Sequence, residues 1–199
     1  MNVKPIERSE YETRMRIVDS FEELLEHSTF GHVSVDELCK KSGVSKSVFY
    51  RLFEGKRSVA TWTFDFFAME YSKALGVSMD WRDSHRHVLQ VMIKYHALFS
   101  SAMNEKGIDS FYQLEIRKLT ANLEAALFDY HGVSRSDELV FQISFISHAT
   151  VLMVCDWFVA GMPYDMETLL DYLEAVVPQK LYNTVNRLMS ANKQNRSYV

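Results

Sequence analysis

Glycine and proline are scarce in this chain, and their scarcity limits the folds open to it. Only 7 Gly and 3 Pro occur among 199 residues, so long stretches lack both. Both residues are unfavourable inside helices, and their absence favours helical structure. Apolar side chains recur at helical spacing, and no period-two strand pattern competes. We therefore predict an all-α fold, with helices over about 9–27, 34–41, 46–53, 56–75, 84–102, 109–131, 136–161 and 166–190.

Charge is distributed unevenly along the chain, whose net charge is −4. Residues 1–58 hold 10 Lys or Arg and 10 Asp or Glu, whereas residues 59–199 hold 12 and 16. The acidic excess therefore lies in the second part. The neutral first part still places six basic residues within 18 positions: Lys40, Lys41, Lys46, Arg51, Lys56 and Arg57. This cluster fits either a nucleic-acid contact or an ordinary solvated helix surface.

The sequence lacks the patterns of several other protein classes. No 18-residue apolar run appears, so no membrane span is expected, and the polar N-terminus without a signal-peptide core favours the cytoplasm. Cys39 and Cys155 form no metal-like pair, and we expect no metal, cofactor or disulfide. No phosphate loop, dinucleotide glycine pattern, His-Glu-x-x-His or Gly-x-Ser-x-Gly occurs. We therefore expect no enzyme and no catalytic residue.

Two short predicted helices on either side of Gly43 form a helix-turn-helix candidate. Ser34 and Glu37 have the spacing of a capping box, and Ser45 is placed to cap the second helix. Gly43 supplies the positive φ that a tight turn between helices needs. The second helix pairs an apolar inner face with a polar outer face suited to the major groove. Two small core helices in any helical protein share this spacing, so the pattern alone leaves both interpretations open.

The residues around this turn are more specific. The run Gly43-Val-Ser-Lys-Ser-Val-Phe-Tyr-Arg-Leu-Phe-Glu-Gly-Lys56 closely resembles the signature of the tetracycline-repressor (TetR) family. That signature is Gly-Val-Ser, three variable residues, an apolar residue and Tyr, two residues, Phe, two residues and Lys. Ser34-Val-Asp-Glu-Leu-Cys resembles the preceding family helix, and Arg16-Ile-Val-Asp-Ser the opening of the first one. The match covers about residues 14–59, whereas the later helices agree with the family in number and length only.

The resemblance implies an all-α protein of two parts. An N-terminal three-helix helix-turn-helix DNA-binding domain spans residues 1–58, and a C-terminal helical effector-binding (ligand-binding) and dimerisation domain spans residues 59–199. It also implies a regulator, most often a repressor, that binds palindromic double-stranded operator DNA as a homodimer and is released by a small-molecule effector. The alternative is a helical protein-interaction module without sequence-specific DNA binding.

Eight residues are predicted to contact DNA: Ser34, Ser45, Lys46, Ser47, Val48, Tyr50, Arg51 and Lys56. Lys46 suits guanine acceptors and Val48 a thymine methyl group. Tyr50 and Lys56 suit phosphates near a helix N-terminus. Tyr50 also fits the rim of a small core, and Lys56 a plain surface lysine. Family members often have Gly-Thr in place of Ser47-Val48, so no operator sequence follows from the resemblance.

Aromatic side chains pair at helical spacing in the second part of the chain. Large flat side chains with a few polar tips line many ligand pockets, although most such stripes are ordinary core. His148 lies one turn from Phe145 in a mainly apolar helix, so its imidazole needs a hydrogen-bond partner. We predict that a mostly apolar or aromatic effector touches six residues: Trp62, Phe66, Tyr95, Phe99, Phe145 and His148.

The last two predicted helices are the expected dimer interface, since the corresponding TetR-family helices form a four-helix bundle with the partner's. Helix 136–161 carries one stripe of apolar and small residues: Val140, Ser144, Ser147, Val151, Val154 and Phe158. Helix 166–190 carries another: Leu169, Leu173, Val177, Leu181, Val185 and Leu188. Both stripes also fit the core of a single chain.

Overall fold

The computed structural model describes residues 7–104 and 110–186 of the protein. The regular structure in these two ranges consists of helices. In chain order they are α1 (Arg8–Leu25), α2 (Val35–Ser42), α3 (Lys46–Leu52), α4 (Lys56–Phe67), α5 (Met69–Ala74), α6 (Trp81–Lys94), α7 (His96–Met103), α8 (Phe111–Glu124), the π-helical η1 (Ala125–Tyr130), α9 (Asp137–Val159) and α10 (Met166–Ala175). Residues 179–186 are also helical. No strand occurs in these two ranges, and the predicted all-α class is confirmed.

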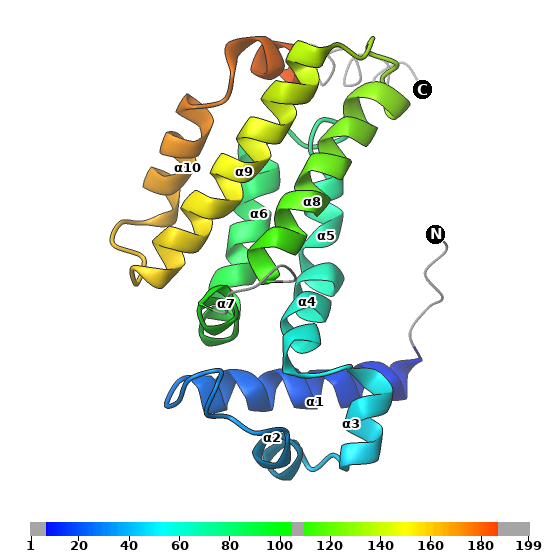
Figure 1. Ribbon diagram of the computed structural model, residues 1–199, viewed down its shortest axis with the longest axis vertical. Helices are drawn as coiled ribbons and strands as arrows, with labels where there is room; N and C mark the ends of the chain where they lie inside the picture. The colour runs from blue at the N-terminus through cyan, green and yellow to red at the C-terminus, as the bar shows by residue number, and fades with distance from the viewer. Residues whose placement is uncertain (1–6, 105–109, 187–199) are drawn as a thin grey trace.

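Two layers divide the molecule along its long axis (Figure 1). Helix α1 lies across the lower end with α2 and α3 beneath it, and α5, α6, α8, α9 and α10 run roughly lengthwise above. The lower layer, which we call the head (residues 8–55), packs around large apolar side chains. Phe21 of α1, Leu38 of α2 and Phe49 of α3 are each 0% exposed. Because these three side chains share one small core, the opposite side of α3 is left facing outward.

Helix α4 rises from the head into the upper layer (Figure 1). Its first half packs on the head through Val59 and Ala60, and its second half carries Phe64, whose ring lies 5.8 Å from that of Phe111. The sequence predicts one helix over 56–75, and this is wrong in detail, because the chain bends at Ala68. The bend turns α5 onto α6 and α8, where Ser72 accepts a hydrogen bond from Asn122 of α8.

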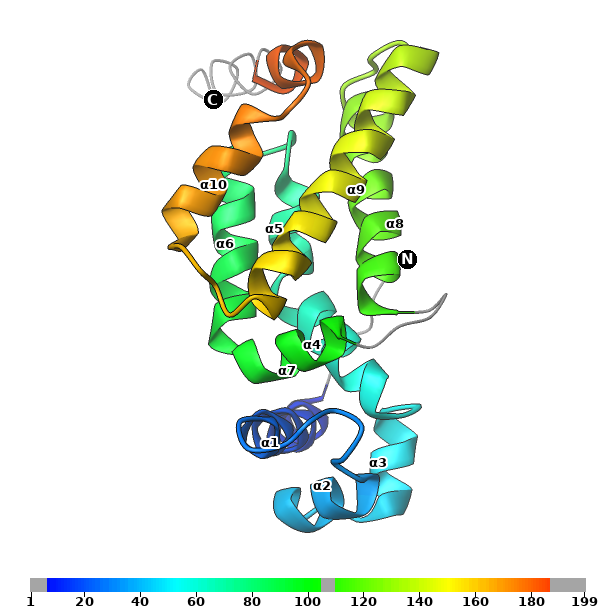
Figure 2. The same ribbon diagram turned by 60° about the vertical axis from the view of Figure 1, so that its left-hand side comes forward.

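A second predicted helix, 84–102, is also divided. It starts earlier, at Trp81, and breaks at Tyr95, whose φ of −112° and ψ of 50° are not helical. Helix α7 then runs across the molecule directly above α1 (Figures 1 and 2). Its first backbone N–H groups are bonded by Glu22 of α1. Periodicity within the segment cannot show this cap, because the capping residue lies about 75 positions earlier in the chain.

The third divided helix is the predicted 166–190. Helix α10 ends at Ala175 and helical structure resumes at residue 179, because Pro178 lacks the N–H group that would continue the helix. Leu188, predicted for the dimer interface, lies outside the described residues. Leu173, Leu181 and Val185 are buried within the single chain.

Helix α9 is the longest and most apolar helix among the described residues. By length and composition it is able to cross a membrane, contrary to the sequence expectation that no such segment exists. Long core helices of globular proteins have the same composition, and α9 packs along α8 and α7. Only 39% of its most apolar window is buried, and five large apolar side chains of this helix are exposed: Phe141, Phe145, Leu152, Met153 and Val159.

Candidate functional site

The turn between α2 and α3 is fixed by the local contacts that the sequence predicts. Ser34 Oγ accepts the N–H of Glu37 at 3.2 Å, and the Glu37 carboxylate accepts the N–H of Ser34 at 2.8 Å. Gly43 has a φ of 66°, which suits a residue without a β-carbon. Ser45 Oγ accepts the N–H of Val48 at 3.3 Å. The capping box, the glycine turn and the second cap are therefore confirmed, and together they set the direction of α3.

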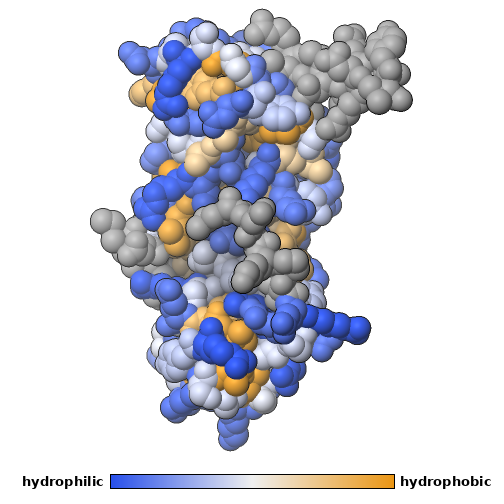
Figure 3. Space-filling view, turned by 90° about the vertical axis from the view of Figure 1, so that its right-hand side faces the viewer, coloured by the Kyte–Doolittle hydropathy of each residue, from blue (hydrophilic) through white to orange (hydrophobic). Residues whose placement is uncertain are grey.

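The outward side of α3 is polar. Lys46, Ser47, Tyr50 and Arg51 are all exposed, and Tyr50 is 57% exposed. Val48 is half-buried and packs against the core of the head, so only part of it is available to a base. Figure 3, which shows the side of the molecule that carries α3, has mostly hydrophilic residues at its lower end, with small apolar areas among them. We call these four exposed residues, together with Ser45 and the half-buried Val48, the α3 face.

Lys46 has a carboxylate partner in the free protein. Its Nζ lies 2.5 Å from Asp36 Oδ1 on α2, and both side chains are exposed. The Asp36 carboxylate raises the pKa of Lys46. A DNA contact by Lys46 therefore replaces an existing ion pair, which lowers the net gain from the contact.

Lys56, the first residue of α4, has a structural role that the sequence does not reveal. Its Nζ donates to the backbone oxygen atoms of Phe30, at 2.5 Å, and Val33, at 2.6 Å. It also lies 5.0 Å from the centre of the Phe30 ring. The ammonium group thus ties the start of α4 to the loop between α1 and α2. The phosphate contact of Lys56 stays a prediction. The side chain is half-exposed, so it would have to contact a phosphate while it keeps these two hydrogen bonds.

A partly open cavity of about 60 Å³ lies in the upper layer. Its walls come from α4, α5, α6, α7, α8 and α9, and most of its surface is apolar. Leu89 and Met92 of α6 face Val151 and Val154 of α9 across it. Apolar spaces between packed helices are one common place for ligand sites, and methionine side chains adapt readily to different occupants.

Five polar side chains interrupt the apolar walls of this cavity: Ser72, Ser84, His85, Glu115 and Thr150. The two serine hydroxyl groups already have partners, Asn122 for Ser72 and the backbone oxygen of Tyr71 for Ser84. Burial raises the pKa of Glu115 to about 7, although the nearby Lys118 ammonium opposes the rise. Lys118 Nζ bonds Glu115 Oε1 at 2.9 Å and Asp65 Oδ1 at 2.6 Å. Burial disfavours charge on Lys118, yet these two carboxylates outweigh it and hold the pKa of Lys118 above its usual value.

Similarity to known sequences decides the family. A TetR-type family described as "Transcriptional regulator C-terminal region" matches residues 79–196, which is more than half of the chain. The chain belongs to the TetR family. A solved structure entitled "Dihydroxyacetone kinase operon activator DhaS" superposes with a TM-score of 0.52 and 17% identity, over 90% of this chain and 95% of that one. At this identity the likeness supports the fold alone. No curated protein sequence matches the chain.

In this TetR-family chain, four of the six residues predicted to touch an effector lie in the layers around α4 and α7. Trp62 and Phe66 stack on each other at 5.0 Å, against α1, where Phe66 lies 5.2 Å from Tyr11. Tyr95 stacks on Phe67 at 5.6 Å. The fourth, Phe99, is 0% exposed. None of the four lines the cavity of the upper layer.

The other two, Phe145 and His148, lie on the outward side of α9. Phe145 is 52% exposed, with its ring 6.5 Å from that of Phe141. His148 is exposed, and its Nδ1 donates to the backbone oxygen of Ser144 at 2.8 Å, which supplies the partner that the sequence argument requires. Neither residue lines the cavity. Effector contact by these six residues stays a prediction. The cavity is lined by other residues, none of which is among the six.

Sequence reasoning missed the polar cavity residues, although one of them left a signal. Phe111, Glu115 and Leu119 are spaced four residues apart, so they share one face of α8. A carboxylate within an otherwise apolar stripe is uncommon, and it marks a position that needs a partner. His85 and Thr150 come from two other helices, and no sequence spacing connects them with Glu115.

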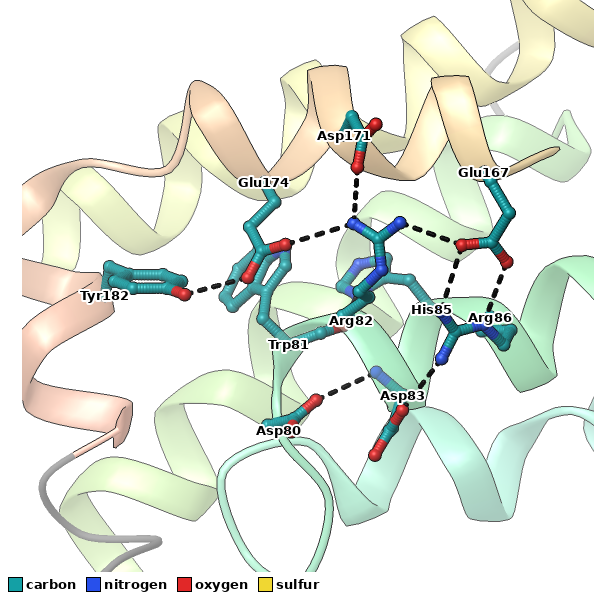
Figure 4. Close-up of polar contacts among 10 residues, drawn as sticks. All are labelled: Asp80, Trp81, Arg82, Asp83, His85, Arg86, Glu167, Asp171, Glu174 and Tyr182. Carbon is teal, nitrogen blue, oxygen red and sulfur yellow. Dashed lines mark hydrogen bonds and ion pairs between the residues drawn. The ribbon is translucent and has the colours of Figure 1, made fainter. Parts of the chain in front are cut away.

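An ion network joins α6 to α10 on the outside of this layer (Figure 4). Arg82 donates to Asp171 at 2.6 Å and to Glu167 at 2.8 Å, and Arg86 bonds Glu167 at 3.0 Å through two of its nitrogens. Glu174 accepts from Arg82 at 3.4 Å. Other residues of α6, among them His85 and Leu89, line the cavity, so this helix connects the cavity wall to α10.

Proposed function

We propose that this TetR-family regulator binds a palindromic DNA operator as a homodimer and is released from it by a small-molecule effector. The observation that carries the proposal is the α3 face, a polar outer surface on a helix whose start, turn and inner side are fixed by caps and core. A helix held in this way is suited to enter the major groove. Under this proposal residues up to about 58 form the DNA-binding domain, and the residues that follow form the domain for effector binding and dimerisation. The boundary lies within the first turn of α4.

The residues of the α3 face have different roles in this proposal. Lys46 and Ser47, near the start of the helix, are placed to reach base edges, with Val48 touching a thymine methyl group from its half-buried position. Tyr50 and Arg51 are placed to bind phosphates, which gives affinity but no sequence reading. Ser34 and Ser45 bring the N-terminal ends of α2 and α3, with their free backbone N–H groups, toward the same phosphates.

The outward apolar side of α9 and α10 supports the proposed homodimer. Phe141 is 71% exposed, Met153 49% and Val159 50% on α9, and Tyr172 of α10 is 58% exposed. Large apolar side chains exposed at helical spacing along one helix are typical of interfaces. The stripes predicted from the sequence are displaced from this surface: Ser147, Val154 and the other described members are buried or half-buried, because they face the chain's own core.

A regulator also needs two conformational states, one that binds the operator and one that does not. A ligand in the cavity would stabilise one of these two states. We propose that an effector occupies the cavity of the upper layer and favours one spacing of the two heads in the dimer. Helix α4 is suited to transmit the change, because Phe64 lines the cavity while Lys56 holds the head. Repression in the cytoplasm is the mode that the family resemblance implies, and binding of the effector then releases the operator.

The decisive experiment is selection of DNA from a random pool by the full-length chain, followed by gel shifts with the selected site. We expect a palindrome whose half-sites are about one helical turn, or a multiple of it, apart. A matched pair of variants separates readout from simple charge: Lys46→Ala on the α3 face and Lys40→Ala on the exposed side of α2. Equal loss of selectivity in both variants would show a general charge effect and contradict base readout by Lys46. No selected sequence at all would favour the protein-interaction module instead.

A further inference from the structure

The polar groups in the cavity wall share one chemical property: each is able to accept a hydrogen bond. His85 is 7% exposed, and its Nδ1 lies 2.7 Å from the backbone oxygen of Trp81. A carbonyl oxygen only accepts, so Nδ1 carries the proton. Burial lowers the pKa of His85, which keeps the ring neutral and leaves Nε2 as an acceptor. Among the residues that the structure describes, Nε2 has no partner.

Glu115 is the strongest acceptor in the wall. Its side chain is 7% exposed, and Oε1 bonds Lys118 Nζ at 2.9 Å. The described part of the chain supplies no partner for Oε2. Lys118 itself does not line the cavity, and its ammonium is shared with Asp65 on the other side. One carboxylate oxygen thus remains for a ligand in an almost fully buried position.

Thr150 adds an unsatisfied hydroxyl group. It is 3% exposed on α9, and Oγ1 has no hydrogen-bond partner among the described residues. A buried polar atom without a partner is unfavourable, so a ligand or water that bonds it is favoured. The lining contains no Lys, Arg, Asn, Gln or Trp side chain. A carboxylate or phosphate ligand would therefore meet Glu115 without any cation in the wall to neutralise it.

We propose that the effector taken up by this cavity is a small apolar amine, whose ammonium group bonds Glu115 while its hydrocarbon part lies among Leu89, Met92 and Val154. The inference rests on the proposed function, since it specifies the effector class for that same cavity. The acidic balance of residues 59–199, 12 basic against 16 acidic, attracts a cation to this part of the chain. Met92 and Met103 are unbranched and let the cavity enlarge for an occupant above 60 Å³.

Three compounds of matched size test the proposal: n-butylamine, butan-1-ol and butyrate. Binding is followed in the full chain by ¹³C-methyl methionine spectra, with the Met92 and Met103 signals assigned by Met→Leu substitution. We expect butylamine to shift both signals and to bind more tightly than butan-1-ol, with butyrate the weakest. Glu115→Gln should weaken butylamine at least about tenfold and leave butan-1-ol unchanged. Glu124→Gln, on the same helix but bonded to Arg135, should bind all three compounds as the wild type does.

The pH dependence of butylamine binding by the wild-type protein provides a second test. It does not depend on whether the Glu115→Gln variant folds. The groups that face Glu115 are Lys118 on its own helix, Asp65 from α4 and Cys155 from α9. Burial raises the pKa of Cys155 to about 12, so that thiol stays neutral, and alkylamines are protonated throughout. Ionisation of Glu115 near pH 7 should then raise butylamine affinity about tenfold from pH 6 to pH 8 and leave butan-1-ol affinity constant.

Each outcome decides the proposal. Butyrate binding as tightly as butylamine, unchanged butylamine affinity in Glu115→Gln, or no shift of the Met92 and Met103 signals with any compound overturns it. Gel shifts run in parallel keep the two proposals apart. If the protein binds the operator but no amine, only the proposed effector class is wrong. If it binds the amine but no operator, the proposed regulator function is wrong and the amine site stands.

Discussion

Glu22 of α1 accepts a hydrogen bond from the backbone N–H of Leu98, 2.7 Å away, at the first turn of α7. Its other carboxylate oxygen accepts the N–H of Ala97 at 2.8 Å. The first N–H groups of a helix have no partner within it, and a carboxylate there also meets the positive end of the helix dipole. One side chain of the head thus fixes α7, whose last residue, Met103, lines the cavity.

Removal of this contact should destabilise the protein measurably. Glu22→Ala leaves the Ala97 and Leu98 N–H groups without their acceptor, and charged hydrogen bonds of this kind contribute about 1.5–3 kcal/mol. We expect urea unfolding to show a loss in the free energy of unfolding of that order. Glu23→Ala is the matched control, because Glu23 is exposed and pairs only with the exposed Lys41. Equal losses in the two variants would show that the cap contributes no more than a surface ion pair.

Contacts within about four residues are what the sequence predicts well. The Ser34 and Glu37 capping box, the Gly43 turn and the Ser45 cap depend on side chains and backbone groups adjacent in the chain, and all are present. The helix-turn-helix and its resemblance to a family follow from these. Helix class is likewise predictable, because burial of one apolar stripe is visible in the period of the sequence.

Long-range contacts explain the errors. The break at Tyr95 is accompanied by the cap from Glu22, and the internal role of Lys56 depends on Phe30 and Val33. None of these pairs has a spacing that sequence periodicity detects. The aromatic residues chosen for the effector pack on each other instead, as Trp62 does on Phe66, because large flat rings satisfy one another in a core.

The ion network of Figure 4 should make stability depend on acid pH. The Arg86 and Arg82 guanidinium groups lower the pKa of Glu167 to about 2, compared with 4.5 when unfolded. A depressed folded-state pKa stabilises the protein above pH 4.5, and that contribution disappears as the pH falls from 4.5 toward 2. Glu167→Gln should therefore melt at a lower temperature than the wild type at pH 7, with a difference that shrinks in this window and in 1 M salt.

The control for this effect is Glu70→Gln, on the exposed side of α5, where the described residues offer no ion pair. It should melt as the wild type does at every pH. A difference between Glu167→Gln and the wild type that stays constant from pH 7 down to pH 2.5 would contradict the ion-pair explanation.

Glu115 should produce the opposite pH dependence. Burial raises its pKa to about 7 from 4.5, so the folded state holds a proton that the unfolded state has released between these values. The free energy of unfolding then falls as the pH rises through this window, by at most about 3 kcal/mol from this one group. Glu115→Gln should lose that dependence, as measured by urea unfolding at pH 5 and pH 7.5. A variant that retains the full wild-type decline would exclude Glu115 as its source.

The Asp36 and Lys46 pair gives a prediction for DNA affinity. Asp36→Asn removes a negative charge near the α3 face and frees Lys46 Nζ, which lies 2.5 Å from that carboxylate. We expect tighter binding to all DNA sequences, by a few-fold, and a steeper salt dependence, because one more cation becomes available to phosphates. Gel shifts at several salt concentrations measure both. Asp19→Asn, on α1, is the matched loss of charge away from α3, and a similar gain there would show a general charge effect only.

The exposed apolar side of α9 gives the last prediction. Phe141 is 71% exposed and pairs with Phe145 at 6.5 Å between ring centres, on the side of the helix away from the core. Under the proposed dimer these rings are buried against the partner's, so a carboxylate at position 141 would have to lose its water there, at a cost of several kcal/mol. Phe141→Glu should therefore give a monomer of 23.2 kDa in light scattering at micromolar concentration, where the wild type has twice that mass.

The matched control is Tyr130→Glu, which places the same charge at an aromatic residue 56% exposed at the end of η1. It should remain dimeric. The monomer should keep its helical circular dichroism spectrum, because Phe141 contributes little to the core of its own chain. It should also lose most of its operator affinity, since a single recognition helix contacts only one half-site. A dimeric Phe141→Glu, or a monomeric wild type, would place the interface elsewhere or remove it.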